Sequence, residues 1–553
     1  MIRALPFPPD ATPERRSETI VAALGFVLLT IAMTWPLAAH PARALASDFG
    51  DPLFNTWVIG WMAEHLTRAL AGHPAALRVL WDANIFFPEP NTLAFSDHLF
   101  IEALQVLPVF WATGNLVLCY NVALLLSFAL SGLGAFLLLR DLTGSRLAGI
   151  TAGVFFAFNE YRLTLEISHL QTLSVHWLPF ALLGLHRCVA TGSRRALAWG
   201  MAALVALNLS AGFHALYYTP FVVAFVVADA IWHGKIRAPG LWIDLGIAAI
   251  SAMSLMLPFT VPYVTMGRQL GFERPLEEVI RFSATFGQYR AALPGFSVPL
   301  LCALAAIGLA VSRPDRRWPV VALAGALGLA FWLSLGPAAG LYRLLYDYAP
   351  GFRGVRAAAR YAMLFFFLLA SLAAVGVALI ESRARRLAHV LAIAGCGVFL
   401  WQTRPAPFPV DRPWPFVSAG LAPVPEYLSP GPKAPPIYRW ASSLDPRAVL
   451  VEFPFGDDAY QLRYMFFTAT SGPRRLGGYS GIFPPGYVTR KNVLQNPLAR
   501  PDEAWTAVGG ATHAIVHADA WPDDTGERIA QWLRAHGAVE VGRFDAARAF
   551  ALP

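Results

Sequence analysis

The stretch SDFGDPLFNTW, residues 47–57, follows the first long apolar segment of the chain, near residues 18–37. That segment is long enough to cross the roughly 30 Å of hydrocarbon in a bilayer, so Asp48 and Asp51 are expected at a membrane edge, where charge can meet water. Asp before Pro is also a typical helix start, because Asp caps the first turn and Pro suits the first helical position. The stretch therefore predicts a helix cap, a functional carboxylate, or both.

The whole chain has the composition of a membrane protein. Hydrophobic residues make up 56% of the 553 residues and charged residues 14%, and apolar runs of spanning length recur along the sequence. The expected fold class is mainly α: a polytopic helical bundle with about eleven spans. These spans are expected near residues 18–37, 115–139, 147–158, 170–188, 196–212, 214–232, 241–263, 296–312, 318–336, 361–380 and 387–402.

Basic clusters occupy every second loop, which predicts the orientation because short Arg-rich loops stay in the cytoplasm. These clusters are Arg15 and Arg16; Arg140 and Arg146; Arg187, Arg194 and Arg195; Lys235 and Arg237; Arg313, Arg316 and Arg317; and Arg383, Arg385 and Arg386. We expect a multi-pass protein of the bacterial inner membrane, with a cytoplasmic N-terminus and an extracytoplasmic tail. The first span is expected to be an anchor and not a cleaved signal peptide. The net charge of +8 reflects topology and predicts no nucleic-acid binding.

The predicted outer loop 38–114 carries two further apolar helices. Residues 53–70 place Trp on one helical face, as expected for an interfacial helix. The second helix begins near an acidic cluster, Asp97, His98 and Glu102. This cluster is expected to hold substrate or, with Asp48 or Asp51, a divalent cation, although Asp97 as a simple helix cap remains open. No spacing determines a third or fourth metal ligand, so the sequence establishes no cofactor.

Other polar groups gather at the predicted outer ends of the spans. Glu166, His169 and Gln171 at one span end are expected to line a cavity. Arginines in the outer loops run against the positive-inside trend and are expected to bind phosphate, since guanidinium groups match phosphate oxygens. The alternative is anchoring to lipid phosphates or pairing with local acids. The substrate-binding candidates are Arg268, Arg274, Arg281, Arg353, Arg356 and Arg360, of which the last three are expected on one helical face.

The composition changes at residue 403. We expect a transmembrane domain over 1–402, a Pro-rich linker over 403–436 and an extracytoplasmic α/β domain over 437–553. Strands are expected at 448–455, 512–519 and 539–544, with an amphipathic helix over 524–537. The loop GGYSGIFPPGY, residues 477–487, is expected either to line a sugar site or to pack this domain against the membrane domain.

The motif GDPLFNTW, residues 50–57, is similar to the acidic-then-aromatic motif that follows the first span in the GT-C superfamily of polyprenyl-phosphate-sugar-dependent glycosyltransferases. The similarity extends over roughly residues 15–402. PGFRGVRAAARYAM, residues 350–363, and the GGYSG segment also resemble the YfhO-like branch of that superfamily. The resemblance implies a GT-C type fold, with Asp51 as catalytic base and Asp48 as the second candidate. The chain departs from the commonest motif, which has two adjacent acids.

The resemblance implies an inverting hexosyl- or pentosyltransferase that uses a lipid-phosphate sugar donor. The implied partners are a polyprenyl-phosphate-linked sugar, membrane lipid, and a glycan, lipid or protein acceptor at the outer face of the membrane. Two alternatives remain open: a flippase or transporter of a lipid-linked saccharide, and a non-catalytic cell-envelope assembly protein. A transporter should carry charge or broken helices near the bilayer midplane, whereas the polar groups of this sequence gather at span ends.

Overall fold

The structure of the protein is a computed structural model that describes residues 13–311, 314–424, 434–470 and 472–553. The chain divides into two compact units. The helical unit comprises Met1–Ala38, Leu124–Val261 and Gly271–Phe408, and the mixed unit comprises Ala39–Ala123, Pro262–Leu270 and Pro409–Pro553. The predicted domain boundaries stay a prediction. Arg313 of one basic cluster and residues 425–433 of the predicted linker lie outside the described residues.

Among the described residues, eight helical segments are long and apolar enough to cross a membrane. They are Arg15–Met33, Leu116–Thr143, Leu170–Thr191, Gly212–Trp232, Pro239–Leu270, Leu276–Val311, Arg317–Ser334 and Ala358–Glu381. The three other predicted spans are also helical, as α5 (Arg146–Ala157), α8 (Arg194–Ser210) and α17 (Arg385–Thr403). The chain is a multi-pass membrane protein, and the predicted fold class is confirmed.

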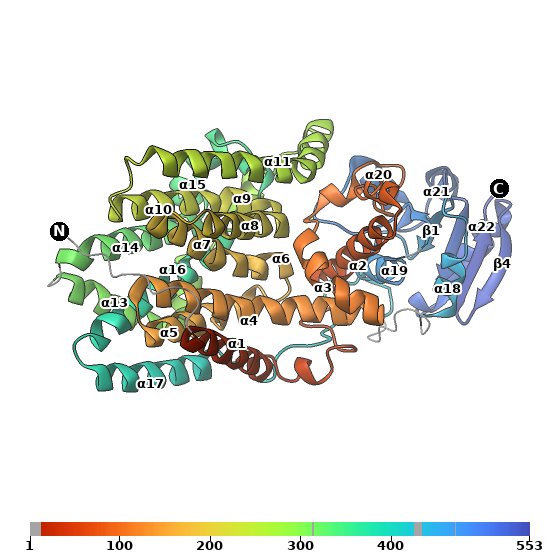
Figure 1. The fold of residues 1–553 in the computed structure, drawn as a ribbon. Coiled ribbons are helices and arrows are strands. Elements are labelled where there is room, and N and C mark those ends of the chain that lie inside the picture. The colour runs from red at the N-terminus through yellow and green to blue at the C-terminus, as the bar shows by residue number, and fades with distance from the viewer. Residues whose placement is uncertain (1–12, 312–313, 425–433, 471) are drawn as a thin grey trace. The chain divides into compact units, whose positions relative to one another are not determined.

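In the helical unit, long helices run side by side around a buried central helix (Figure 1). α16 (Tyr361–Glu381) is packed by α5, α13, α14 and α17 and is apolar on all sides, as a helix surrounded by others must be. The remaining helices that lie wholly or partly in this unit are α1 (Pro13–Met33), α4 (Leu116–Thr143), α6 (Leu170–Leu173), α7 (Trp177–Thr191), α9 (Gly212–Tyr217), α10 (Thr219–Trp232), α11 (Pro239–Leu270), α12 (Leu276–Arg281), α13 (Phe286–Val311), α14 (Pro314–Ser334) and α15 (Leu341–Tyr348).

Basic loops that alternate along the sequence meet at one end of the helical unit. The Asp141 carboxylate lies 3.8 Å from Arg15, 3.8 Å from Arg140 and 2.7 Å from Arg187. Glu18 lies 3.6 Å from Arg140. Loops on one membrane face should meet in this way, because alternate connections of a bundle share an end. Which end faces the cytoplasm remains a prediction.

The mixed unit contains a five-stranded sheet with the order β2-β1-β3-β5-β4. The strands are β1 (Val449–Phe453), β2 (Arg474–Arg475), β3 (His513–His517), β4 (Val539–Phe544) and β5 (Ala547–Ala551). β1 is parallel to β2 and β3, whereas β5 is antiparallel to β3 and β4. β1 is buried along its whole length, as expected for an internal parallel strand. The sequence predicted β1, β3, β4 and helix α22 (Thr525–Ala535) but neither β2 nor β5.

The predicted outer loop supplies helices to the mixed unit. α2 (Asp51–Leu70) packs on α3 (Phe100–Thr113) and on α19 (Asp458–Phe467). Trp57 of α2 is only 1% exposed, so α2 buries its apolar residues against protein, which differs from the predicted interfacial helix. The other α-helices of this unit are α18 (Pro436–Ser442), α20 (Pro485–Leu494) and α21 (Pro501–Val508).

Candidate functional site

The acidic loop before α2 is held by its own side chains. Asp48 accepts a hydrogen bond from the Gly50 N–H and one from the Ser47 hydroxyl, each at 2.8 Å. This is a local Asx-type turn, and Ser47 has a left-handed φ of 68°, which is costly for a residue with a side chain. Asp48 therefore shapes the loop that places Asp51.

The Pro-rich segment after the last span also holds this loop. Ser47 N–H donates to the Pro409 carbonyl at 2.9 Å, and Arg412 N–H donates back to the Ser47 carbonyl at 3.0 Å. A Cβ atom added to Gly50 would lie 1.9 Å from the Trp414 ring, so only glycine fits there. Residues 409–414, predicted to be a linker, are thus a structural partner of the acidic loop.

Asp51 is the first residue of α2 and accepts a hydrogen bond from a tyrosine of the tail. The Tyr479 hydroxyl lies 3.1 Å from Asp51 Oδ1, and its ring meets the Phe54 ring edge-on, with centroids 5.6 Å apart. The N-cap is Gly50 and not Asp51. The Asp51 carboxylate thus combines a helix N-terminus, which stabilises negative charge, with a hydroxyl donor.

Tyr479 belongs to the GGYSG loop, which is hydrogen-bonded to the backbone of residues 86 and 87. Phe86 N–H donates to the Gly477 carbonyl at 3.2 Å, and Phe87 N–H donates to the Arg475 carbonyl at 2.8 Å. The loop therefore packs against the segment around residue 86 and also delivers a side chain to Asp51. The sequence singled out this loop but did not pair it with the acidic motif.

Tyr120 near the start of α4 lies within electrostatic range of both Asp48 and Asp51. Its hydroxyl is buried and has no hydrogen-bond partner among the described residues. A buried polar group of this kind calls for an explanation, and a ligand hydroxyl beside the two carboxylates would supply one. Sequence reasoning missed Tyr120, because a tyrosine inside an apolar span carries no local signal.

In the predicted cluster of Asp97, His98 and Glu102, the side chains of His98 and Glu102 are buried. The His98 ring contacts the rings of Trp81 and Tyr263, with centroid distances of 5.7 Å and 6.0 Å, and its Nδ1 accepts the Phe100 N–H at 3.1 Å. Burial lowers the pKa of His98 to about 3, so the ring is neutral. Glu102 is fully buried in the first turn of α3.

The described residues contain no group of three His, Cys, Asp or Glu side chains able to hold a metal ion. Asp48, Asp51 and Asp97 therefore do not form the three-ligand site that the sequence left open. A divalent cation held by fewer protein ligands remains a prediction.

In the helical unit, the Glu166 carboxylate lies close to three polar side chains, those of Tyr161, His169 and Arg360. It accepts a hydrogen bond from Tyr161 at 3.2 Å and lies 3.3 Å from His169 Nδ1 and 4.0 Å from Arg360 Nε. Gln171, which was predicted beside them, is buried in α6. Glu166, His169 and Arg360 thus form one cluster that joins residues far apart in the sequence.

Arg353, Arg356 and Arg360 do not share a helical face, and that prediction is wrong. Single turns, η7 (Phe352–Gly354) and η8 (Ala358–Arg360), are separated by extended backbone, and α16 begins only at Tyr361. The helix is interrupted at Val355, whose backbone is extended with φ −112° and ψ 131°, directly after Gly354, and glycine weakens a continuous helix.

Two of these arginines pair with local glutamates, the alternative that the sequence left open. Arg353 lies 3.2 Å from Glu273. Glu278 lies 3.4 Å from Arg356 and 3.1 Å from Arg274, and burial lowers the pKa of Arg274. The Arg353–Glu273 pair is exposed and contributes little stability.

Two guanidinium groups nevertheless converge on one aromatic ring. Arg356 lies 4.8 Å and Arg281 5.2 Å from the centroid of Phe282. Arg268, in contrast, is exposed at the end of α11 and belongs to the mixed unit. Arg281 and Arg356 of the helical unit therefore lie beside the same aromatic ring, and Arg356 also pairs with Glu278.

Arg162 is a fully buried cation that the sequence did not single out. Its guanidinium donates to the carbonyls of Ser127 and Leu173, each at 3.1 Å, and lies over the rings of Phe128 and Phe156. Burial lowers the pKa of Arg162 to about 9. These contacts make Arg162 a packing element of the helical unit.

No protein-family model matches the chain, and no curated protein matches it. Among solved structures, the oligosaccharyltransferase AglB of Archaeoglobus fulgidus, in complex with an inhibitory peptide and a dolichol-phosphate, is similar, with a TM-score of 0.49, 13% identity, and coverage of 90% of this chain and 69% of AglB. The apo form of an oligosaccharyltransferase from that organism gives a TM-score of 0.38, 14% identity and coverage of 97% and 74%. Apo ArnT from Cupriavidus metallidurans gives a TM-score of 0.35 and 11% identity, with coverage of 97% of this chain and 98% of ArnT.

These three matches have TM-scores of 0.35–0.49, so the resemblance to the GT-C superfamily stays a prediction. With identities of 11–14% they concern the fold alone, and the roles proposed below rest on this chain's own residues.

Proposed function

We propose that the protein is an integral membrane glycosyltransferase that moves a sugar from a polyprenyl-phosphate carrier to an acceptor, with Asp51 as general base. The observation that carries the proposal is the Asp51 carboxylate at the N-terminus of α2, hydrogen-bonded by Tyr479 at 3.1 Å. A base must be ionised to accept a proton, and both the helix end and the hydroxyl donor favour the ionised form.

In the proposed reaction, Asp51 takes the proton of an acceptor hydroxyl as the acceptor oxygen bonds to the anomeric carbon of the donor sugar. The bond from that carbon to the phosphate oxygen breaks, and its electron pair leaves with the polyprenyl phosphate. This single displacement inverts the anomeric configuration. Asp48 positions the loop, and Tyr479 orients the carboxylate.

A polyprenyl phosphate carries negative charge, which cationic side chains stabilise. Arg281 and Arg356 of the helical unit, both over the Phe282 ring, are proposed to bind this phosphate. Arg360 is proposed to act together with Glu166 and His169 in binding the donor. A divalent cation is a further proposed partner of the phosphate.

The reaction is proposed to occur at the outer face of the bacterial inner membrane, with the N-terminus in the cytoplasm and the C-terminal domain outside. The alternation of basic loops supports this orientation, as does their meeting around Asp141. The proposed partners are a polyprenyl-phosphate-linked sugar, membrane lipid and a glycan, lipid or protein acceptor.

The test compares the purified parent with Asp51→Asn for sugar transfer from a polyprenyl-phosphate donor. Asn keeps the volume but cannot accept the proton, so turnover should fall on the order of 10² to 10⁴. Glu64→Gln is a matched control, because it removes a carboxylate from the same helix, where Glu64 pairs with Arg68. Thermal stability of each variant is measured alongside.

Parental transfer by Asp51→Asn would rule out the proposed base. A parent that moves lipid-linked sugar across vesicles without transferring it would instead establish the transporter alternative. Both assays use the full chain in the same lipid, so that their outcomes can be compared directly.

A further inference from the structure

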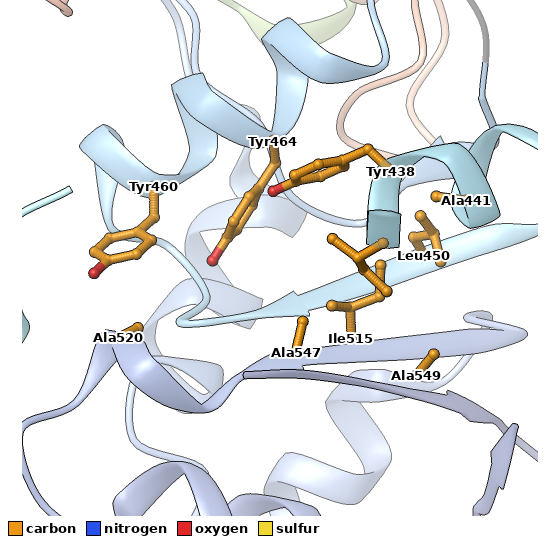
Figure 2. Close-up of a cluster of buried hydrophobic side chains, with 10 residues drawn as sticks. Tyr438, Ala441, Leu450, Tyr460, Tyr464, Ile515, Ala520, Ala547 and Ala549 are labelled. Atoms are coloured by element: carbon orange, nitrogen blue, oxygen red, sulfur yellow. The ribbon is translucent and has the colours of Figure 1, made fainter. Parts of the chain in front are cut away.

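The C-terminal part of the mixed unit contains a cavity of 160 Å³. Three tyrosines line it, with Tyr460 and Tyr464 from α19 and Tyr438 from α18. Figure 2 shows the Tyr460 and Tyr464 side chains extending from their helix towards the strands, with Tyr438 beside Tyr464. An apolar cavity of roughly 150 Å³ holds one benzene molecule, so this one is of the size of a single six-membered ring.

Charged side chains complete the lining of this aromatic cavity. Arg463 and Asp519 both lie in the wall, with Asp519 exposed at its edge. His517 stacks on Tyr464, with ring centroids 4.9 Å apart and an interplanar angle of 13°. Its Nε2 lies 3.1 Å from Glu452, which holds the ring in place. The cavity wall therefore combines aromatic rings with one arginine, Arg463, and two acidic residues, Asp519 and Asp545.

A second cavity, of 340 Å³, also has Arg463 in its wall. Its walls include Phe49 and Leu53, which flank Asp51 in the sequence, and Trp414 of the Pro-rich segment. Arg463 and Pro423 belong to the walls of both cavities. The residues of both walls belong to the mixed unit.

We propose that the aromatic cavity binds one pyranose ring of a saccharide. A pyranose presents an apolar face of C–H groups and a rim of hydroxyls, so it needs aromatic surface together with donors and acceptors. The tyrosine rings supply the surface, the Arg463 guanidinium donates to sugar oxygens, and the Asp519 carboxylate accepts from sugar hydroxyls. The identity of this saccharide rests on the proposed function: if that function holds, the saccharide is the acceptor of the transferred sugar, and the acceptor is a glycan.

The test titrates the full-length protein in detergent with methyl α-glucoside, N-acetylglucosamine and glucuronate by calorimetry. At least one of these pyranosides should bind. Arg463→Gln should raise its dissociation constant about tenfold, as expected for loss of a charge-assisted hydrogen bond, and Asp519→Asn should also weaken binding. Arg439→Gln and Asp502→Asn are matched controls, because both residues are exposed and neither lines the cavity.

Absence of binding by all three pyranosides, or parental affinity in both Arg463→Gln and Asp519→Asn, would overturn the inference. If the parent binds a pyranoside but transfers no sugar, the cavity assignment stands and only the proposed function fails. Unchanged melting temperatures in the two variants would show that weakened binding does not come from unfolding.

Discussion

Tyr479→Phe is the most direct test of how the tail contributes to the proposed active site. The change removes the hydroxyl that lies 3.1 Å from Asp51 Oδ1 and keeps the ring that contacts Phe54. A hydrogen bond to a charged group contributes about 1.5–3 kcal/mol. Tyr479 is partly exposed, so we expect a value near the lower limit, which corresponds to about a tenfold loss of turnover.

The pH dependence of transfer should change as well. The Tyr479 hydroxyl bonds to the ionised carboxylate, so its removal makes protonation of Asp51 easier. The acidic limb of the kcat/KM profile should therefore move to higher pH. A purely structural contact would lower the melting temperature without moving this limb.

Tyr487→Phe is the matched control for this experiment. Tyr487 lies in the first turn of α20, eight residues after Tyr479, and its buried hydroxyl has no hydrogen-bond partner among the described residues. Its loss should leave transfer unchanged. The reasoning is refuted if Tyr479→Phe retains the parental rate and pH profile, or if Tyr487→Phe loses as much activity.

Three further predictions follow from individual contacts. Replacing both Arg281 and Arg356 with Gln should weaken polyprenyl-phosphate binding at least about tenfold in a fluorescence titration, whereas Arg290→Gln should not. Binding by the double variant as tight as by the parent would exclude these two arginines as ligands. Gly50→Ala should lower the melting temperature, because the added Cβ would lie 1.9 Å from an indole ring, and an unchanged melting temperature would contradict that packing. Burial holds the pKa of His517 at about 3, below its ordinary 6.5. The stability that the neutral ring contributes is therefore complete above pH 6.5 and is lost as the pH falls from 6.5 towards 3. Denaturant titrations should show a lower free energy of unfolding at pH 5 than at pH 7 in the parent, and a smaller difference in His517→Asn.

The sequence by itself determined the features that depend on local composition. All eleven predicted spans are helical, because a long apolar segment in lipid must satisfy its backbone hydrogen bonds internally. β1, β3 and β4 were predicted because their residues suit strands, and Asp51 was predicted at a helix start because Pro52 follows it. Each of these features is encoded within about twenty neighbouring residues.

Only the tertiary structure decided which distant groups meet. Asp51 and Tyr479 are 428 residues apart, and no periodicity relates them. The Pro-rich segment was predicted as a linker from its composition, yet its backbone pairs with Ser47. The arginine spacing suggested a helical face, but the backbone is extended at Val355, directly after Gly354. Such contacts depend on how separate elements pack, and because many packings satisfy the same local pattern, the pattern does not determine them.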